Sequence, residues 1–264
     1  MDIIVLVKQV PDTTEIKIDK ETNTLIRAGV QSIVNPNDLA GVEEALKLKA
    51  RYGGTVSVVT MGPMQAESML VELYGRGVDA CYLLSDRAFA GSDTWATSTI
   101  LSSFLQTLKY DLIIAGYQAI DGDTAQVGPQ VAEFLNIPQV TYLSEITALN
   151  GRELIVKKRT DSEVLTLSVE LPVLVTTLAD MNKPRYMNAW DIYHNTDKKV
   201  HLVTFNDLNI DPSHIGLKGS PTKVKKTYVK QVQAKSEKVV MTPEDAAKWI
   251  TKLLYPYMEV KNHE

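Results

Sequence analysis

Cysteine is nearly absent from this sequence, because its 264 residues include only Cys81. A single cysteine excludes a disulfide framework within the chain and any iron–sulfur or zinc cluster built from cysteines. The four histidines, at positions 194, 201, 214 and 263, fall late in the chain and lack the spacing of metal ligands. We therefore expect no metal site and a reducing compartment, of which the cytoplasm is the simplest.

Long hydrophobic runs and a basic excess are also missing. The apolar run in residues 1–7 is far too short to span a bilayer, and it lacks the basic lead and cleavage site of a signal peptide. The net charge of −4 gives no general case for binding nucleic acid. The locally basic residues 218–238 are typical of a solvated face or tail. The sequence predicts neither membrane insertion nor a nucleic-acid partner.

Three common nucleotide-binding motifs do not occur. No Gly-x-Gly-x-x-Gly turn follows the first predicted strand, and no Gly-x-x-x-x-Gly-Lys-Ser/Thr loop is present anywhere. The Ser-Gly-Gly-x-Asp loop of ATP-cleaving synthetases is also missing after that strand. These absences argue against an ordinary Rossmann dehydrogenase, a P-loop NTPase and a synthetase. A nucleotide bound here is expected to be held rather than cleaved.

What the first half contains is an alternation of strand-like runs with helical patterns, which predicts a parallel sheet with helices on both faces. Strands are expected at 3–7, 56–60, 80–84 and 112–115. Asn35 to Asp38 and Ser92 to Thr94 offer caps for two of the helices between them. The predicted fold is α/β, a doubly wound and mostly parallel Rossmann-like sheet, and a ligand is expected at the carboxyl ends of its strands.

Beyond Pro138 the hydrophobic pattern changes to period two. Residues 153–159 and 164–169 alternate apolar with polar side chains, which predicts an antiparallel hairpin at the sheet edge, and residues 172–177 read as another buried strand. Residues 196–240 are polar without a long period, as in an extended arm, and Thr242-Pro243 starts a helix. We expect an α/β domain over 1–195 and a C-terminal arm and helix over 196–264.

The most informative stretch is 110–135, which reads as strand, glycine loop and helix. Unpaired amides and the positive end of the helix dipole converge at such a loop and suit phosphate oxygens. Asp121, Asp123 and Thr124 can cap the helix without pointing at a phosphate. The helix begins either near Thr124 or with Pro129 in its first turn.

The loop from Ala119 to Pro129 resembles the signature loop of the beta subunit of electron-transfer flavoproteins, which grips the phosphates of an adenine nucleotide. The resemblance covers nearly the whole chain, including Val7-Lys8-Gln9-Val10-Pro11, Val34-Asn35-Pro36-Asn37-Asp38 and Pro184-Arg185-Tyr186. Lys8 has an alternative role as a surface cation, and Asn37 and Asp38 as helix caps. The expected cofactor-binding residues are Val7, Lys8, Asn37, Asp38, Thr60, Gly62, Ala115, Gln118, Ala119, Asp121, Gly122, Asp123, Thr124, Ala125, Gln126, Val127 and Gly128.

The resemblance leaves two cofactors to consider. In the electron-bifurcating type the beta subunit carries a second FAD, whereas in the other type it carries AMP as a structural ligand. The AMP loop reads Asp-Asp-Asp followed by Asn-Gln-Thr-Gly, while Asp121-Gly122-Asp123-Thr124 is similar to the bifurcating loop. Gly122 also removes a carboxylate and bulk near the phosphate. We therefore expect FAD, with AMP as the alternative.

The family's reaction is what the resemblance implies for function. NADH gives a hydride to the flavin of this subunit, one electron passes to the alpha-subunit FAD and an acyl-CoA dehydrogenase, and the other passes to ferredoxin or flavodoxin. No catalytic side chain is expected, because the flavin carries the chemistry. The alternative is a non-redox adenylate-binding module, against which the long polar arm and terminal helix argue.

Two segments are candidates for partner contacts. Residues 180–195 concentrate aromatic and methionine side chains that either pack on their own domain or form a docking surface. The resemblance implies docking to the partner dehydrogenase, although the leucine anchor of the mitochondrial type is missing. It also implies that the C-terminal part embraces the alpha subunit, whereas the alternative is packing on its own sheet. The expected partner-binding residues are Pro184, Arg185, Tyr186, Met187 and Trp190.

Overall fold

The computed structural model describes residues 1–12, 17–18, 25–26, 32–222 and 239–258, and most of the predicted basic stretch lies outside them. The chain divides into two compact units, Met1–Lys225 and Lys226–Glu264. No helix among the described residues is long and apolar enough to cross a bilayer.

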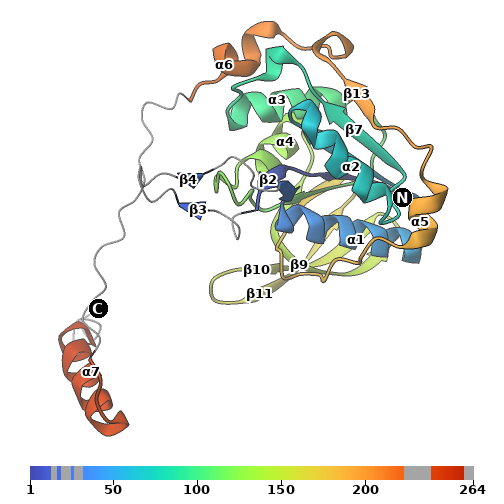
Figure 1. The fold of residues 1–264 in the computed structure, drawn as a ribbon. Helices are drawn as coiled ribbons and strands as arrows, with labels where there is room; N and C mark the ends of the chain where they lie inside the picture. Colours follow the sequence, from blue (N-terminus) through green and yellow to red (C-terminus); the bar gives the residue numbers. More distant parts are fainter. Residues whose placement is uncertain (13–16, 19–24, 27–31, 223–238, 259–264) are drawn as a thin grey trace. The chain divides into compact units, whose positions relative to one another are not determined.

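A nine-stranded sheet organises the first unit, in the order β11-β10-β9-β12-β8-β1-β6-β7-β13 (Figure 1). Its central strands pair in parallel and are almost continuously apolar, because helices cover both faces. The predicted α/β fold with a mostly parallel sheet is confirmed. The central strands are β1 (Asp2–Leu6), β6 (Thr55–Met61), β7 (Ala80–Leu84), β8 (Leu112–Gly116) and β12 (Val173–Thr177).

Two helices pack on each face of this sheet. On one face α1 (Pro36–Tyr52) and α2 (Glu67–Tyr74) share a buried core with β1 and β6, and on the other α3 (Thr94–Leu105) and α4 (Val127–Leu135) form a second core. Gly41 allows α1 to lie close to β8, since a Cβ there would be 2.8 Å from Ile114 Cγ2. Asp93 caps α3 as predicted, accepting from the Ala96 amide at 3.0 Å.

The strand order reverses at β1. The chain proceeds from β1 to β6 and β7 on one side, and then returns through α3 to β8 on the other side of β1. In open α/β sheets this reversal leaves a crevice at the carboxyl ends of the two adjacent strands. The fold therefore places a ligand-sized space beyond Leu6 and Gly116.

The far edge of the sheet is antiparallel. The predicted hairpin is confirmed as β10 (Glu153–Arg159) and β11 (Val164–Glu170). The long strand β9 (Gln139–Asn150) links it to the parallel part, pairing antiparallel with β10 and parallel with β12. Two small antiparallel sheets lie outside the main one: β2 (Gln9–Pro11) with β5 (Ser32–Val34), and β3 (Lys17–Ile18) with β4 (Leu25–Ile26).

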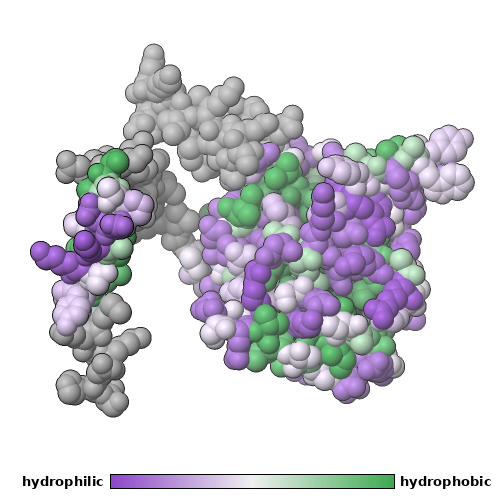
Figure 2. Space-filling view, turned by 90° about the horizontal axis from the view of Figure 1, so that it is seen from below, coloured by the Kyte–Doolittle hydropathy of each residue, from purple (hydrophilic) through white to green (hydrophobic). Residues whose placement is uncertain are grey.

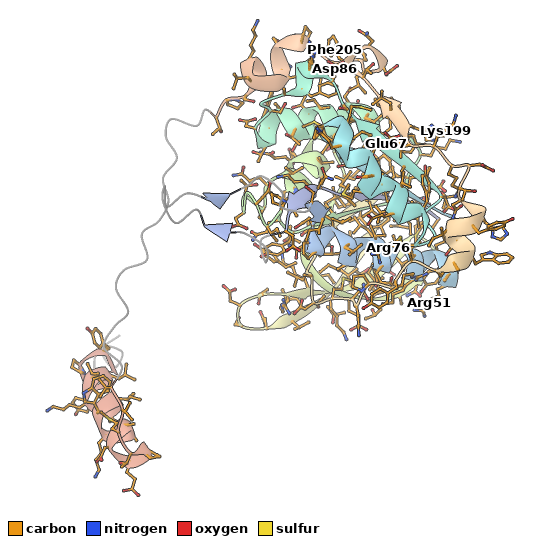
Figure 3. The ribbon with its side chains drawn as sticks, viewed as in Figure 1. Arg51, Glu67, Arg76, Asp86, Lys199 and Phe205 are labelled. Carbon is orange, nitrogen blue, oxygen red and sulfur yellow. The ribbon has the colours of Figure 1, made fainter. Side chains whose placement is uncertain are left out.

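Residues 201–203, which were expected to belong to an extended arm, join the sheet instead. Strand β13 (His201–Val203) pairs in parallel with β7, and the Phe205 amide donates to Asp86 Oδ2 at 3.1 Å, two residues that are labelled in Figure 3. The first unit consequently reaches Lys225 rather than the expected boundary at 195. A strand of three residues carries too little period-two signal to be recognised in a polar stretch.

Short helices complete the first unit, and α7 is the helix in the described part of the second unit. Residues 180–195, which showed no period, contain the six-residue helix α5. Helix α7 begins as predicted, with the Asp245 amide donating to Thr242 Oγ1 at 3.2 Å. These elements are η2 (Met64–Ala66), η3 (Arg87–Phe89), α5 (Ala189–His194), η4 (Phe205–Asp207), η5 (Pro212–His214), α6 (Gly216–Gly219) and α7 (Pro243–Met258).

Candidate functional site

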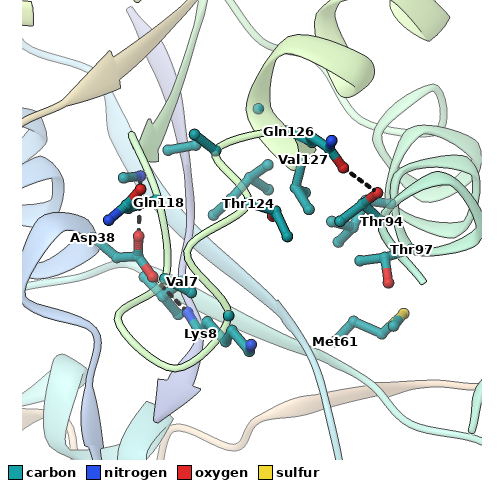
Figure 4. Close-up of a pocket in the computed structure, with 18 of the residues that line it drawn as sticks. Val7, Lys8, Asp38, Met61, Thr94, Thr97, Gln118, Thr124, Gln126 and Val127 are labelled. Atoms are coloured by element: carbon teal, nitrogen blue, oxygen red, sulfur yellow. Dashed lines mark hydrogen bonds between the residues drawn. The ribbon is translucent and has the colours of Figure 1, made fainter. Parts of the chain in front are cut away.

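A cavity of about 380 Å³ lies at the carboxyl ends of β1 and β8 (Figure 4). Its volume falls in the range of small-molecule sites, roughly 300 to 1,000 Å³. Most of the residues expected from the sequence line it, although they come from three separate segments. These are Val7, Lys8, Asp38, Ala115, Gln118, Ala119, Gly122, Thr124, Ala125, Gln126, Val127 and Gly128.

The expected residues that do not line the cavity are Asn37, Asp121, Asp123, Thr60 on β6 and Gly62 just after that strand. Val59 and Met61 line the cavity, whereas Thr60 between them is buried and does not. Successive side chains of a strand point to opposite faces, so these three cannot all face one space. Gly62 is likewise absent from the lining, and its amide donates to the Leu84 carbonyl at 3.1 Å.

The amino end of α3 is a wall of the cavity that sequence reasoning did not assign to the site. Ser92, Asp93, Thr94 and Thr97 line the cavity there, beside Leu101. The Thr94 hydroxyl donates to Gln126 Oε1 at 2.8 Å and so joins this wall to the glycine loop. The cap sequence Ser92-Asp93-Thr94 was the available signal, because it follows a parallel strand at the same edge of the sheet as the loop.

Helix α4 begins at Val127 with its amino end open. Gln126 occupies the N-cap position and makes no side-chain cap bond. The expectation that Asp121, Asp123 or Thr124 caps this helix is wrong, because the helix starts beyond their reach and Asp123 accepts from Gln118 Nε2 at 2.9 Å. Pro129 lies in the first turn, where its missing N–H costs no hydrogen bond.

The loop before α4 is bent into a concave row of amides. Asp123 and Ala125 have φ values of 50° and 53°, a left-handed conformation that residues other than glycine rarely adopt. Ala125 is followed by Gln126 in a right-handed conformation, and such alternation forms an anion-binding nest. Among the described residues, the amides from Thr124 to Gly128 have no protein acceptor. Anionic oxygens are the groups that such a nest binds.

Asp38 ties the two strand ends to α1. Its carboxylate accepts from the Lys8 amide at 2.7 Å, the Gly116 amide at 3.0 Å and Asn35 Nδ2 at 2.9 Å. The carboxyl is buried, and desolvation outweighs these donors and raises its pKa to about 7. Asp38 thus builds the cavity wall at the point where the strand order reverses.

Neither Asn37 nor Asp38 is the cap of α1, because Asn35 takes that position and makes no side-chain cap bond. Asn35 and Asn37 instead hold the glycine loop through their side chains. Asn35 Nδ2 and Asn37 Nδ2 each donate to the Gln118 carbonyl at 2.9 Å, and the Ile120 amide donates to Asn35 Oδ1 at 3.2 Å. Asn35 was quoted in the sequence resemblance but was not expected as a site residue.

Lys8 is the only lysine or arginine among the described residues that line the cavity. Its Nζ lies 2.7 Å from Asp121 Oδ1 and 2.8 Å from Oδ2, and the lysine side chain is about half exposed. Lys8 therefore serves both as a surface cation, the alternative considered from the sequence, and as a lining residue. It can turn from Asp121 toward an anion bound at the nest.

The residues fit an adenine nucleotide. The nest and Lys8 suit phosphate oxygens, while Leu6, Val59 and Met61 provide apolar wall for a flat ring. Apart from its chain neighbours, a Cβ added at Gly122 would meet no atom of the described residues within 4 Å, so the loop leaves open space there. Within the described ranges, no group of three or more His, Cys, Asp or Glu side chains is arranged to hold a metal ion.

The expected partner-binding residues form a separate surface. Tyr186 and Trp190 are 85% and 71% exposed, and Met187 is also exposed. Arg185 differs, because its guanidinium pairs with Glu43 of α1. Side chains of near-neutral hydropathy protrude on the right of Figure 2, the side on which Figure 1 draws α5.

Comparison with known proteins is consistent across nearly the full length. The sequence-family model of the electron transfer flavoprotein domain matches residues 22–206 of this chain. The chain is 47% identical over 254 residues to electron transfer flavoprotein subunit beta of Clostridium acetobutylicum, covering 96% of this chain and 98% of that protein. It is 43% identical over 244 residues to caffeyl-CoA reductase-Etf complex subunit CarD of Acetobacterium woodii, covering 92% and 93%. It is 41% identical over 247 residues to protein FixA of Azotobacter vinelandii, covering 91% and 88%.

Proposed function

This chain belongs to the electron transfer flavoprotein family as a beta subunit, and on that premise we propose that it binds FAD and bifurcates electrons together with an alpha subunit in the cytoplasm. The observation that carries the proposal is the open amino end of α4, where the nest at Ala125 and Gln126 faces the cavity. Free amides at a helix start bind phosphate oxygens without a lysine-containing motif. The diphosphate of a dinucleotide fits this concave loop.

FAD is favoured over AMP by the space beside the loop. Apart from its chain neighbours, no atom of the described residues lies within 4 Å of the position that a Cβ would take at Gly122, so a ligand larger than a mononucleotide meets no obstacle from them there. A carboxylate at this position, as in the AMP-binding loop, would place a third negative charge beside Asp121 and Asp123. The apolar wall at Met61 and Leu101 provides further surface for a ring system.

When bound, FAD supplies two-electron exchange with NADH and one-electron exchange with two acceptors. One acceptor is the alpha-subunit flavin, which serves an acyl-CoA dehydrogenase, and the other is ferredoxin or flavodoxin. The residues of this chain bind and orient the cofactor. The loop amides hold phosphate oxygens, Lys8 adds a positive charge at the mouth, and Leu6 and Val59 keep water from one wall. No nucleophile or general acid is required of the chain.

Helix α7 supports the proposed alpha-subunit partner. Its apolar side chains Trp249, Ile250, Leu253 and Leu254 are each about half exposed, although their spacing places them on one stripe of the helix. An exposed stripe of this length is typical of a protein interface. We propose that the alpha subunit covers it. The name of CarD places that relative in a complex with a CoA-ester reductase, which supports a dehydrogenase of acyl-CoA as the further partner.

The test is to co-express the two subunits, release their cofactors with acid and quantify them. Two FAD per heterodimer are expected, together with a flavin spectrum that NADH bleaches. One FAD and one AMP would reject the proposal in favour of a carrier with structural AMP. Gly122→Asp is the matched variant: it should lower the FAD content of this subunit while leaving the alpha-subunit FAD in place.

A further inference from the structure

The segment that follows β12 is fastened along α1 by polar side chains. The Ala179 amide donates to Asn37 Oδ1 at 2.9 Å, and Asn182 Nδ2 donates to Glu44 Oε2 at 2.8 Å. Arg185 then meets Glu43 on the same helix. Residues 179–185 are therefore held to α1 at three points, of which the Glu43 contact is the last before the exposed aromatic side chains.

Glu43 makes the most complete of these contacts. Its carboxylate is largely buried and accepts from the Arg185 amide at 2.9 Å, from Arg185 Nε at 2.9 Å and from Arg185 Nη2 at 3.0 Å. A bidentate ion pair of this kind fixes the orientation of the guanidinium as well as its distance from the carboxylate. Arg76 Nη1 also donates to the Arg185 carbonyl (Arg76 is labelled in Figure 3). Both the backbone and the side chain of Arg185 are thus engaged within the chain.

The residues just beyond Arg185 are the most exposed aromatics of the first unit. Tyr186 is 85% exposed, Trp190 71% and Tyr193 75%, and Trp190 and Tyr193 stand on α5. This helix has six residues and buries none of them. A single exposed turn is not stable by itself in water, so its place depends on its attachments. Besides Arg185, the attachments include the Asn188 amide, which donates to the Gly75 carbonyl at 3.1 Å.

We propose that Glu43 is a positioning residue for partner docking. By holding Arg185 it presents Tyr186, Trp190 and Tyr193 as one aromatic surface, and Arg185 belongs to the support of that surface rather than to its contact face. The inference rests on the proposed function in one respect, that the partner is the electron-accepting dehydrogenase. Three exposed aromatic side chains fit an apolar pocket on that partner, because Asp191, the one acidic residue among them, accepts from Asn188 Nδ2 within the same segment.

The experiment compares Glu43→Gln with the native heterodimer. Glutamine keeps the size of the side chain but replaces one acceptor oxygen with an N–H donor that faces the guanidinium. The Michaelis constant for the dehydrogenase is expected to rise about tenfold, while kcat, NADH-dependent reduction of a small dye and FAD content stay the same. Hydrogen exchange of residues 186–194 is expected to become faster, which a partner-independent measurement can detect. Arg185→Gln combined with Glu43→Gln should be no worse than either change alone.

Two controls separate docking from general stability. Leu46→Val removes buried volume on α1 and lowers the melting temperature, yet it should leave the Michaelis constant unchanged. Trp190→Ala should raise the Michaelis constant without lowering the melting temperature, because the side chain is exposed. The positioning role is overturned if the native complex passes electrons normally and Glu43→Gln changes neither the Michaelis constant for the dehydrogenase nor the hydrogen exchange of residues 186–194. A change in only one of the two also overturns it. A native complex that passes no electrons to the dehydrogenase rejects the partner in the proposed function instead.

Discussion

Gly116 and Asp38 fit together so closely that no side chain can be added between them. The Gly116 amide donates to Asp38 Oδ1 at 3.0 Å, and a Cβ built on this glycine would overlap that same oxygen. It would also lie 2.7 Å from Asn37 Cβ. The end of β8 and the start of α1 are therefore in contact through backbone atoms and one buried carboxylate.

Gly116→Ala is expected to lower the free energy of unfolding by about 2 kcal/mol or more, because the overlap forces α1 away from β8. Gly122→Ala is the matched control in the same loop region. Beyond its chain neighbours, its added methyl meets no described residue within 4 Å, so its effect on stability should stay within about 0.5 kcal/mol. Urea unfolding of the two variants measures the difference. Equal losses would contradict the packing described for Gly116.

Asp38 predicts a particular pH dependence of stability. Its pKa is raised from 3.8 to about 7 in the folded chain, so the folded state binds a proton that the unfolded state has released between these values. The contribution of Asp38 to the free energy of unfolding therefore falls as the pH rises from about 4 to about 7, by about 1.4 kcal/mol per unit inside that window. Above pH 7 the contribution is constant.

Urea unfolding of the native chain and Asp38→Asn at pH 5.0 and 6.5 isolates this group, because the other titrating groups are common to both. The stability difference between the two proteins should change by about 2 kcal/mol across that interval. Parallel pH profiles for the native chain and the variant would contradict the raised pKa.

The Lys8–Asp121 pair predicts changes of opposite sign in cofactor affinity. Lys8→Gln removes the positive charge at the cavity mouth and should weaken FAD binding, whereas Asp121→Asn frees Lys8 and should strengthen it. Each change should alter the free energy of unfolding by less than about 1 kcal/mol, since the pair is solvent-exposed. Fluorescence titration of the flavin-free protein measures the affinities. Shifts in the same direction would be inconsistent with Lys8 facing the anion.

Helix α7 predicts the behaviour of the subunit interface. Leu253→Asp places a charge in the exposed apolar stripe and should abolish co-purification of the alpha subunit. Lys252→Ala, on the neighbouring polar face, should leave it intact. Pull-down of a tagged alpha subunit measures both, and the melting temperature of the beta subunit alone should not change. Retained association in Leu253→Asp would exclude this stripe from the interface.

Several features of the site were predictable from local patterns. The strands at Leu112–Gly116 and Ala80–Leu84 appear as short apolar runs between glycines and caps, and Asp93 precedes its helix in an ordinary capping sequence. The start of α4 was harder, because Gln126 is an unusual N-cap residue and the open end leaves no capping signal. Strand β13 was not predicted, because three residues are too few to show a hydrophobic period.

By itself, the sequence determined the alternation of strands and helices, the glycine loop and the family of the chain, since hydrophobic period and turn chemistry act over a few neighbouring residues. Only the tertiary structure decided which polar groups meet. Lys8 pairs with Asp121, which is 113 residues away in the sequence. Asp38 accepts a hydrogen bond from the Gly116 amide, 78 residues away. Such pairs follow from the strand order around β1, which long-range packing selects and no local pattern encodes.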